Sequence, residues 1–220
     1  MSKRATKKTT KRGGNNNSND SWMDDENDDK VFLEYVAKRK AMDALKTKTP
    51  EQVVVEFLET TMIPYVVIGG KAAAYYIGKS NSGIRESDLK ILAISSDDYD
   101  VMVNVSSKDT FIQEVVRRIN EQTPVNVSLK ENPSLDIYMV GWVENGTFKS
   151  VVDVHAIANE DKLPKLDDAT SKIKFVNKRW LCKELLFTLE NRSSQDQVVK
   201  YYKRNARNRL LKCEDVIKNK

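Results

Sequence analysis

The chain has 220 residues, of which 40% are hydrophobic and 31% are charged, as in soluble globular proteins with one large domain or a domain with an attached subdomain. No apolar run approaches the roughly 20 residues that a membrane-spanning helix needs, so we expect no membrane segment. The net charge is +5, and the segment 172–220 alone has 14 basic and 5 acidic residues. This local excess of positive charge predicts a polyanionic partner.

The N-terminal part is expected to be a tail followed by two helices. Residues 1–30 combine low hydrophobicity with blocks of opposite charge, which predicts a disordered charged tail. Apolar residues at helical spacing predict a helix over 31–46. Another helix is expected over 49–61, because the sequence Thr-Pro-Glu-Gln combines a capping box with proline at the first helical position.

A mixture of strand and helix patterns follows. Strands are expected over 65–68, 89–94, 98–105, 125–129, 135–143 and 148–158, and helices over 71–77, 108–122, 177–192 and 193–217. Ser106 or Ser107 can cap the helix over 108–122, and Asn145-Gly146 predicts a tight hairpin between the last two strands. We therefore predict an α+β fold, with a mixed β-sheet flanked by helices over 31–171 and a basic helical subdomain over 172–220.

Two carboxylates lie close together in the strand pattern "DDYDVMV". Asp98 and Asp100 are two residues apart, so their side chains are expected on one face of the strand. Neighbouring carboxylates repel each other unless a cation lies between them. Mg²⁺ is typically bound by one or two carboxylates together with substrate phosphates, so these residues are candidate metal ligands.

A third carboxylate, Asp153, lies inside the β-branched run "SVVDVHA", where aspartate is unfavourable. Three carboxylates on adjacent strands can hold two metal ions for in-line phosphoryl transfer. His155 is expected on the same face as Asp153, where packing or hydrogen bonding accounts for it better than metal binding.

Gly69 and Gly70 stand where the strand over 65–68 meets the following helix. Glycines at such a junction permit a tight turn and close approach of a ligand, and the start of a helix favours bound phosphate. Lys71 adds a positive charge there. The spacing is not that of a P-loop, because four residues before the Gly-Lys pair are missing and Ala72 replaces the metal-binding Ser or Thr.

The motifs "VIGGKAA", "SSDDYDVMV" and "VVDVHA" together resemble the nucleotidyltransferase superfamily of DNA polymerase β type. Within it, the chain is most similar to the viral poly(A) polymerase catalytic subunits of poxviruses and related large DNA viruses, in "AAAYY" and in the ending "VVKYYKRNARNRLL". The resemblance covers about 64–211 and implies a polymerase β-type core. It implies that Asp98, Asp100 and Asp153 are the catalytic metal ligands, and that Gly69, Gly70 and Ser96 contact a nucleoside triphosphate.

One departure from the family pattern concerns the distance between the motifs. Gly70 and Asp98 are 28 positions apart, which is longer than the usual gap and predicts an insertion or an extra strand between them. The site requires this segment to fold back and bring the glycines to the carboxylates.

The C-terminal helix presents basic residues at helical spacing. Lys200, Arg204 and Arg207 fall on one face and are expected to hold the triphosphate or an RNA backbone. An ordinary solvated helix would show the same spacing. Tyr201 and Tyr202 could stack bases, although core packing suits at least one of them better.

The resemblance implies a Mg²⁺- or Mn²⁺-dependent enzyme that adds AMP from ATP to an RNA 3′ end by a two-metal mechanism. Two alternatives stay open: a toxin-type nucleotidyltransferase that modifies a tRNA or a protein, and a non-catalytic RNA-binding subunit that keeps the fold. A homodimer, or a complex with an accessory subunit, also stays open.

The two cysteines, Cys182 and Cys213, favour a reducing compartment over a disulfide framework. We expect the protein to be located in the cytoplasm, or, if it is viral, in the host cytoplasm or the virion. The basic N-terminal tail would also permit a nuclear location.

Overall fold

The computed structural model describes residues 48–80, 83–91, 95–158, 163–164, 166, 171–190 and 198–218, without the side chains of 90–91 and 198–203. The tail predicted over 1–30 and the helix predicted over 31–46 lie outside these residues. None of the helices that are described combines the length and apolar character that a membrane crossing requires.

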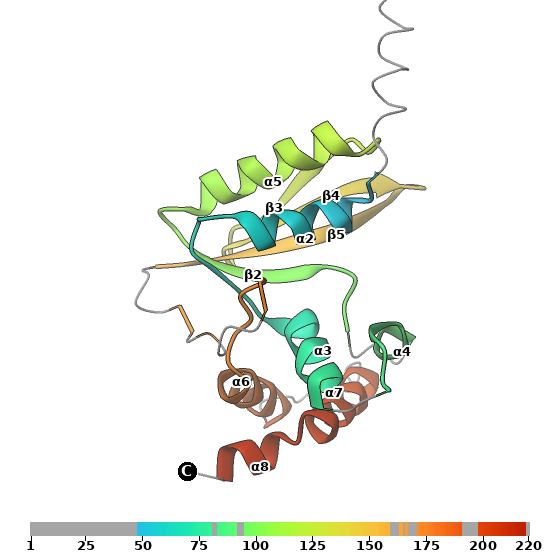
Figure 1. Ribbon diagram of the computed structural model, residues 1–220, viewed down its shortest axis with the longest axis vertical. Coiled ribbons are helices and arrows are strands. Elements are labelled where there is room, and N and C mark those ends of the chain that lie inside the picture. Colours follow the sequence, from blue (N-terminus) through green and yellow to red (C-terminus); the bar gives the residue numbers. More distant parts are fainter. Residues whose placement is uncertain are drawn as a thin grey trace, which may run out of the picture. The chain divides into compact units, whose positions relative to one another are not determined.

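Five strands of the described chain form one mixed sheet (Figure 1). They are β1 (Tyr65–Val67), β2 (Tyr99–Asn104), β3 (Ser128–Asn132), β4 (Ile137–Glu144) and β5 (Thr147–Ile157), in the spatial order β1-β2-β5-β4-β3. The pair β2–β5 is parallel, and the other pairs are antiparallel. The expected α+β fold with a mixed sheet is confirmed.

Two helices cover one face of the sheet, α2 (Pro50–Thr60) and α5 (Lys108–Gln122) (Figure 1). Their buried side chains, such as Phe57 and Phe111, pack against Val101 and Val154 of the central strands in one hydrophobic core. The alternation of these valines with polar residues therefore directs the polar side chains of β2 and β5 to the opposite face.

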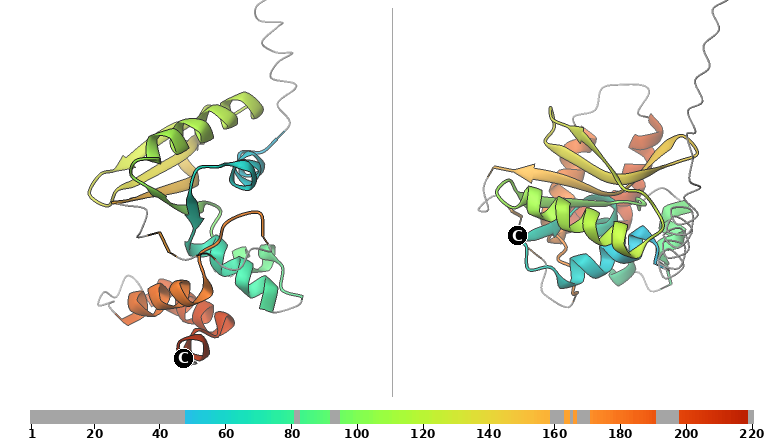
Figure 2. Two further views of the ribbon diagram at one scale, coloured as in Figure 1. Left: turned by 60° about the vertical axis from the view of Figure 1, so that its left-hand side comes forward. Right: turned by 90° about the horizontal axis from the view of Figure 1, so that it is seen from above.

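The remaining helices belong to a second hydrophobic cluster on the other side of the sheet (Figures 1 and 2). They are α3 (Gly69–Ser80), α4 (Glu86–Ile91), α6 (Lys178–Glu190), α7 (Val198–Leu211) and α8 (Cys213–Lys218). Alanines on α3 allow close helix packing, and Leu181, Leu185 and Leu211 fill the space between α3, α6 and α7. This cluster places the C-terminal helices opposite the polar face of β2 and β5.

Local sequence signals at two element ends act as expected. The side chain of Thr49 accepts a hydrogen bond from the Gln52 backbone N–H at 3.2 Å, and the Gln52 side chain accepts one from the Thr49 N–H at 2.9 Å. Asn145 and Gly146 have φ values of 51° and 76°, the left-handed pair that a tight β4–β5 hairpin requires. Ser107 precedes α5 but makes no capping hydrogen bond with its side chain.

Several predicted boundaries are wrong. Of the strand predicted over 89–94, residues 89–91 belong to helix α4 instead, and 92–94 lie outside the described residues. Helix α4 begins where the Asp88 side chain accepts the Arg85 backbone N–H at 3.0 Å. The helix predicted over 193–217 is broken at Lys212, whose φ of 55° ends α7 before α8 begins, and its first part, 193–197, lies outside the described residues. Helix α3 begins at Gly69, two residues before the predicted start, and β3 begins at Ser128, because the valines before it pack onto the core as a loop.

The expectation that the two cysteines form no disulfide framework is also wrong. Cys182 of α6 and Cys213 of α8 form a disulfide, with their Cα atoms 5.1 Å apart and both residues fully buried. Nothing in the sequence shows that these two helices pack together, so the proximity that a disulfide requires was not predictable from spacing alone.

Candidate functional site

The central feature of the polar sheet face is a pair of aspartates on neighbouring strands. Asp100 of β2 and Asp153 of β5 are register partners in the parallel pair. The strand that carries Asp153 therefore lies beside the strand that carries Asp100, as three carboxylates acting together would require. Asp98 precedes the first residue of β2, and its carboxylate lies close enough to the other two to interact electrostatically.

Burial and the neighbouring negative charges disfavour the ionised forms of Asp98 and Asp153. Burial raises the pKa of Asp98, and the charge of Asp100 raises it further. Burial also raises the pKa of Asp153, against the lowering effect of its hydrogen bond from Ser150, and the other two aspartates add to the increase. Within the described residues, no lysine or arginine forms a salt bridge with any of the three. The cluster therefore holds negative charge that a bound cation would neutralise.

Two neighbouring side chains orient the carboxylates. The hydroxyl of Ser150 donates to Oδ1 of Asp153. Nε2 of His155 lies 3.4 Å from Oδ1 of Asp100, and both side chains are about one quarter exposed. His155 is thus a partner of the carboxylate cluster, as expected from the sequence, where hydrogen bonding explains this residue better than metal binding does.

The glycine turn lies directly against the aspartates. A Cβ atom on Gly69 would be 2.1 Å from Oδ2 of Asp100, and one on Gly70 would be 2.6 Å from Oγ of Ser96. The Ile68 backbone N–H donates to the Asp100 carbonyl at 2.8 Å, and the Ser96 hydroxyl donates to the Asp98 carbonyl at 2.9 Å. The long segment after Gly70 therefore folds back through α4 and returns the chain to the glycines.

The buried side chain of Lys71 pairs with two glutamates that are about half exposed. Its ammonium group donates to Glu51 of α2 at 2.7 Å and to Glu86 of α4 at 2.8 Å, and the side chain is 4% exposed. Burial by itself would lower the pKa of Lys71, but the hydrogen bonds to the two glutamates raise it. Lys71 does not line the pocket described below, so its expected contact with phosphate stays a prediction.

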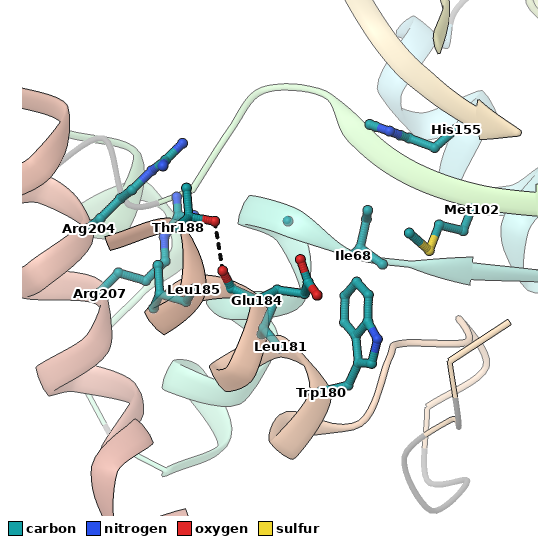
Figure 3. A pocket seen from close by; sticks show the side chains of 11 residues that line it. Ile68, Met102, His155, Trp180, Leu181, Glu184, Leu185, Thr188, Arg204 and Arg207 are labelled. Atoms are coloured by element: carbon teal, nitrogen blue, oxygen red, sulfur yellow. Dashed lines mark hydrogen bonds between the residues drawn. The ribbon is translucent and has the colours of Figure 1, made fainter. Parts of the chain in front are cut away.

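A pocket of about 320 Å³ extends from the sheet to the C-terminal helices (Figure 3). The apolar part of its lining includes Ile68 of the glycine turn, Met102 of β2, and Trp180 and Leu185 of α6. Gly69 and His155 connect this pocket to the carboxylate cluster. The pocket therefore joins an apolar surface to the acidic site.

Two arginines of α7 form the basic part of the pocket. Arg204 and Arg207 project from the same helix face, and burial together with the charge of Arg204 lowers the pKa of Arg207, while Asp100 acts in the opposite direction. The structure thus brings two of the three predicted basic residues to the pocket, and Arg207 lies close enough to Asp100 to interact with it electrostatically. Lys200 lies in α7, but its side chain is outside the described part of the chain, as are those of Tyr201 and Tyr202.

The residues present suit a hard divalent cation. Three carboxylates supply oxygen donors of the kind that Mg²⁺ binds, and burial together with the neighbouring carboxylates raises the pKa of Asp98 and of Asp153. In the conformation described, no three His, Cys, Asp or Glu side chains among the described residues are gathered around one point as a metal site. Asp153 is turned to Ser150 and Asp100 to His155, so both would rotate to share an ion.

The contribution of α6 to the pocket was not predicted from the sequence. Trp180, Glu184 and Thr188 all line the pocket and follow one another at intervals of four residues. The signal was an aromatic and an acidic side chain on a helix face otherwise occupied by leucines, but only the packing of α6 against α3 shows that this face borders the site.

No protein-family model matches the sequence, and no curated protein matches it either. Among solved structures, the polyadenylate synthase of Megavirus superposes on 94% of this chain with a TM-score of 0.55 at 14% sequence identity. The chain spans 40% of the length of that protein. An antigenic nucleotidyltransferase-like protein of Paracoccidioides brasiliensis gives a TM-score of 0.44 at 13% identity, over 76% of this chain and 77% of that one, which is too low to indicate a shared fold. The Megavirus superposition confirms the nucleotidyltransferase-type fold.

Proposed function

We propose that this chain is a Mg²⁺-dependent nucleotidyltransferase that transfers AMP from ATP to the 3′ end of an RNA. The observation that supports it most is the position of Asp100 and Asp153, in register on adjacent parallel strands and directly beside the Gly69–Gly70 turn. A metal-binding acidic pair next to the start of a helix is an arrangement suited to a nucleoside triphosphate.

Several groups that line the pocket would bind the triphosphate. The start of α3 presents backbone N–H groups and the positive end of the helix dipole to the triphosphate. Arg204 and Arg207 add positive charge on the other side of the pocket. The absence of a side chain on Gly69 leaves room for the Asp100 carboxylate against the turn, so that a metal ion held by this carboxylate would lie beside the phosphates.

The carboxylates of Asp98, Asp100 and Asp153 would hold the metal ions. Bound Mg²⁺ supplies the positive charge that activates the attacking 3′-hydroxyl and stabilises the departing pyrophosphate. The protein's own part is mainly to position the α-phosphorus in line with the hydroxyl and to neutralise charge, as phosphoryl transfer generally requires. Ser150 and His155 orient the carboxylates before the metal binds.

Incubation of the purified protein with labelled RNA, each of the four NTPs in turn, and Mg²⁺ or Mn²⁺ tests the proposal. We expect extension of the RNA with ATP, and loss of extension in Asp100→Ala. A protein that extends no RNA under any of these conditions would contradict the proposal. Incorporation into a protein band or into tRNA alone would instead support a toxin-type nucleotidyltransferase.

The control for this experiment is Glu190→Ala, at the exposed end of α6. Glu190 does not line the pocket and lies on a different element from each carboxylate, so its replacement should leave extension unchanged. If the wild type and Glu190→Ala both bind RNA without metal or ATP and neither extends it, the result would support a non-catalytic RNA-binding subunit.

A further inference from the structure

The pocket has two chemically different ends along helix α6. Trp180, Glu184 and Thr188 are spaced by about 6 Å along the helix axis, since each step of four residues rises 1.5 Å per residue. In Figure 3, the Glu184 side chain lies between the indole of Trp180 on one side and the two arginines of α7 on the other. The span of about 12 Å from Trp180 to Thr188 suits a ligand with an apolar end and an anionic end.

The anionic end of such a ligand belongs at Arg204 and Arg207. Both guanidinium groups line the pocket, and the start of α3 lies at Gly69, which lines it too. Thr188, at the same end of α6, already donates its hydroxyl hydrogen to the Glu184 carbonyl at 2.7 Å, so this hydroxyl is engaged within the helix. The phosphates of a nucleotide are therefore placed toward α7.

The carboxylate of Glu184 is unfavourable to phosphate. Among the described residues, no lysine, arginine or histidine forms a salt bridge with it, and it is solvent-exposed within the lining of the pocket. A carboxylate only accepts hydrogen bonds, so an anionic ligand tolerates it only where the ligand presents a donor. A nucleotide offers such donors on its base and on its ribose hydroxyls, and the apolar side chains that line the pocket beside Glu184 favour the base over the ribose there.

The apolar lining beside Glu184 matches a planar base. Trp180 is partly buried against the second hydrophobic cluster, and Ile68 and Met102 line the same part of the pocket (Figure 3). Stacking on an aromatic side chain stabilises any base, because every base has a π-face. Stacking alone therefore gives affinity without selectivity, and the polar group beside it decides which base is preferred.

We propose that Trp180 stacks on the base of the incoming nucleotide and that Glu184 favours adenine over guanine and hypoxanthine by accepting a hydrogen bond from its 6-amino group. Adenine presents an amine donor at this position, whereas guanine and hypoxanthine present a carbonyl oxygen there. A carboxylate facing a carbonyl oxygen has no hydrogen to accept, and both groups lose water without compensation. This inference rests on the proposed function and names the substrate class of the same pocket.

The test compares ATP with inosine 5′-triphosphate, which differs in carrying the 6-carbonyl in place of the amine. Equilibrium binding to the full-length protein is measured by calorimetry, with Mg²⁺ and without RNA, so that no transfer is required. We expect ATP to bind roughly tenfold more tightly than inosine triphosphate, as one charge-assisted hydrogen bond would give. In Glu184→Ala this ratio should fall to about one, mainly through weaker ATP binding.

Two further variants and the control Glu190→Ala separate an effect on nucleotide selectivity from an effect on folding. Glu184→Gln keeps the size of the side chain, and its amide can donate to the 6-carbonyl. It should therefore improve binding of inosine triphosphate and lower the ratio of ATP affinity to inosine triphosphate affinity. Trp180→Leu should weaken both nucleotides by a similar factor and leave the ratio unchanged. Glu190→Ala, on the same helix and outside the pocket, should match the wild type for both nucleotides.

The outcomes distinguish the two proposals. Equal affinity of the wild type for both nucleotides, or tighter binding of GTP than of ATP, overturns the assignment of Glu184 even if RNA extension is observed. An unchanged ratio in Glu184→Ala overturns it as well. Failure of the wild type to bind any nucleoside triphosphate contradicts the proposed function itself, and the base assignment with it.

Discussion

Gly69 and Asp100, 31 positions apart in sequence, are in direct contact: a Cβ atom on the glycine would lie 2.1 Å from Oδ2 of the aspartate. Gly69 has a φ of 64°, so its backbone conformation favours glycine independently of the contact. This contact joins the glycine turn to the carboxylate cluster, and it depends on the return of the chain through α4.

Gly69→Ala should lose both nucleotide binding and RNA extension. The left-handed conformation costs a non-glycine residue roughly 1–2 kcal/mol, and the new methyl group would displace the Asp100 carboxylate. Gly78→Ala is the matched control on the same helix, because a Cβ there meets no atom within 4 Å. It should raise thermal stability slightly, by up to about 1 kcal/mol of helix propensity, with extension unchanged. Normal extension by Gly69→Ala would show that this contact is not needed.

Asp153→Asn should inactivate the protein while stabilising its metal-free form. Because burial and the neighbouring aspartates raise the pKa of Asp153, its negative charge opposes folding at neutral pH, and the amide removes that charge. Extension should fall more than about a hundredfold, since even outer partners of metal ligands contribute 10–100-fold. Thermal denaturation in EDTA measures the stability. A lower melting temperature for the variant would contradict the electrostatic account of the cluster.

Lys71→Met should affect stability more than nucleotide binding. The ammonium group of Lys71 is hydrogen-bonded to Glu51 and Glu86, which tie α2 and α4 to α3. Both glutamates are about half exposed and can regain water, so the expected loss is about 1–3 kcal/mol, measured by urea denaturation. ATP affinity should change less than about threefold. A tenfold loss of ATP affinity with unchanged stability would instead support the phosphate contact expected from the sequence.

Reduction of the Cys182–Cys213 disulfide should destabilise the C-terminal helices. The bond closes a loop of 31 positions, for which chain entropy gives about 3–4 kcal/mol. Denaturation with and without a reductant measures this difference, and the double variant Cys182→Ala, Cys213→Ala should show no effect of the reductant. Equal stability of the wild type in both conditions would mean that the bond does not contribute.

Tyr65 should make stability fall steeply at high pH. Burial raises the pKa of Tyr65 to about 12, from an ordinary value near 10. Its hydroxyl donates to the Leu58 carbonyl and accepts the Lys174 backbone N–H. The folded state holds the phenol proton of Tyr65 more tightly than the unfolded state does. The contribution of Tyr65 to the free energy of unfolding is therefore complete below pH 10, and about 3 kcal/mol of it is lost between about pH 10 and 12. Tyr65→Phe should lack this loss, and tyrosinate absorbance should show one fewer late-titrating group than in the wild type.

Local signals predicted the parts of the fold that depend on near neighbours in the chain. The capping box at Thr49 and the Asn145-Gly146 hairpin both act within a few residues, and both are found as expected. The helix over 108–122 and the Asp100 strand follow from periodicity. Residues 89–91 of a predicted strand are helical instead, because a short apolar run suits a helix as well as a strand, and packing of Leu89 into the second hydrophobic cluster decided between them.

The sequence by itself determined the chemical groups of this protein: three aspartates in strand patterns, paired glycines before a helix, and a basic C-terminal segment. Only the tertiary structure decided which of them meet. Strand pairing put Asp153 beside Asp100, and the packing of α6 and α7 against α3 brought Trp180, Glu184 and the arginines to the same pocket while turning Lys71 away from it. The reason is physical: residue type and spacing specify local conformation, whereas contacts between distant segments depend on how whole hydrophobic faces pack.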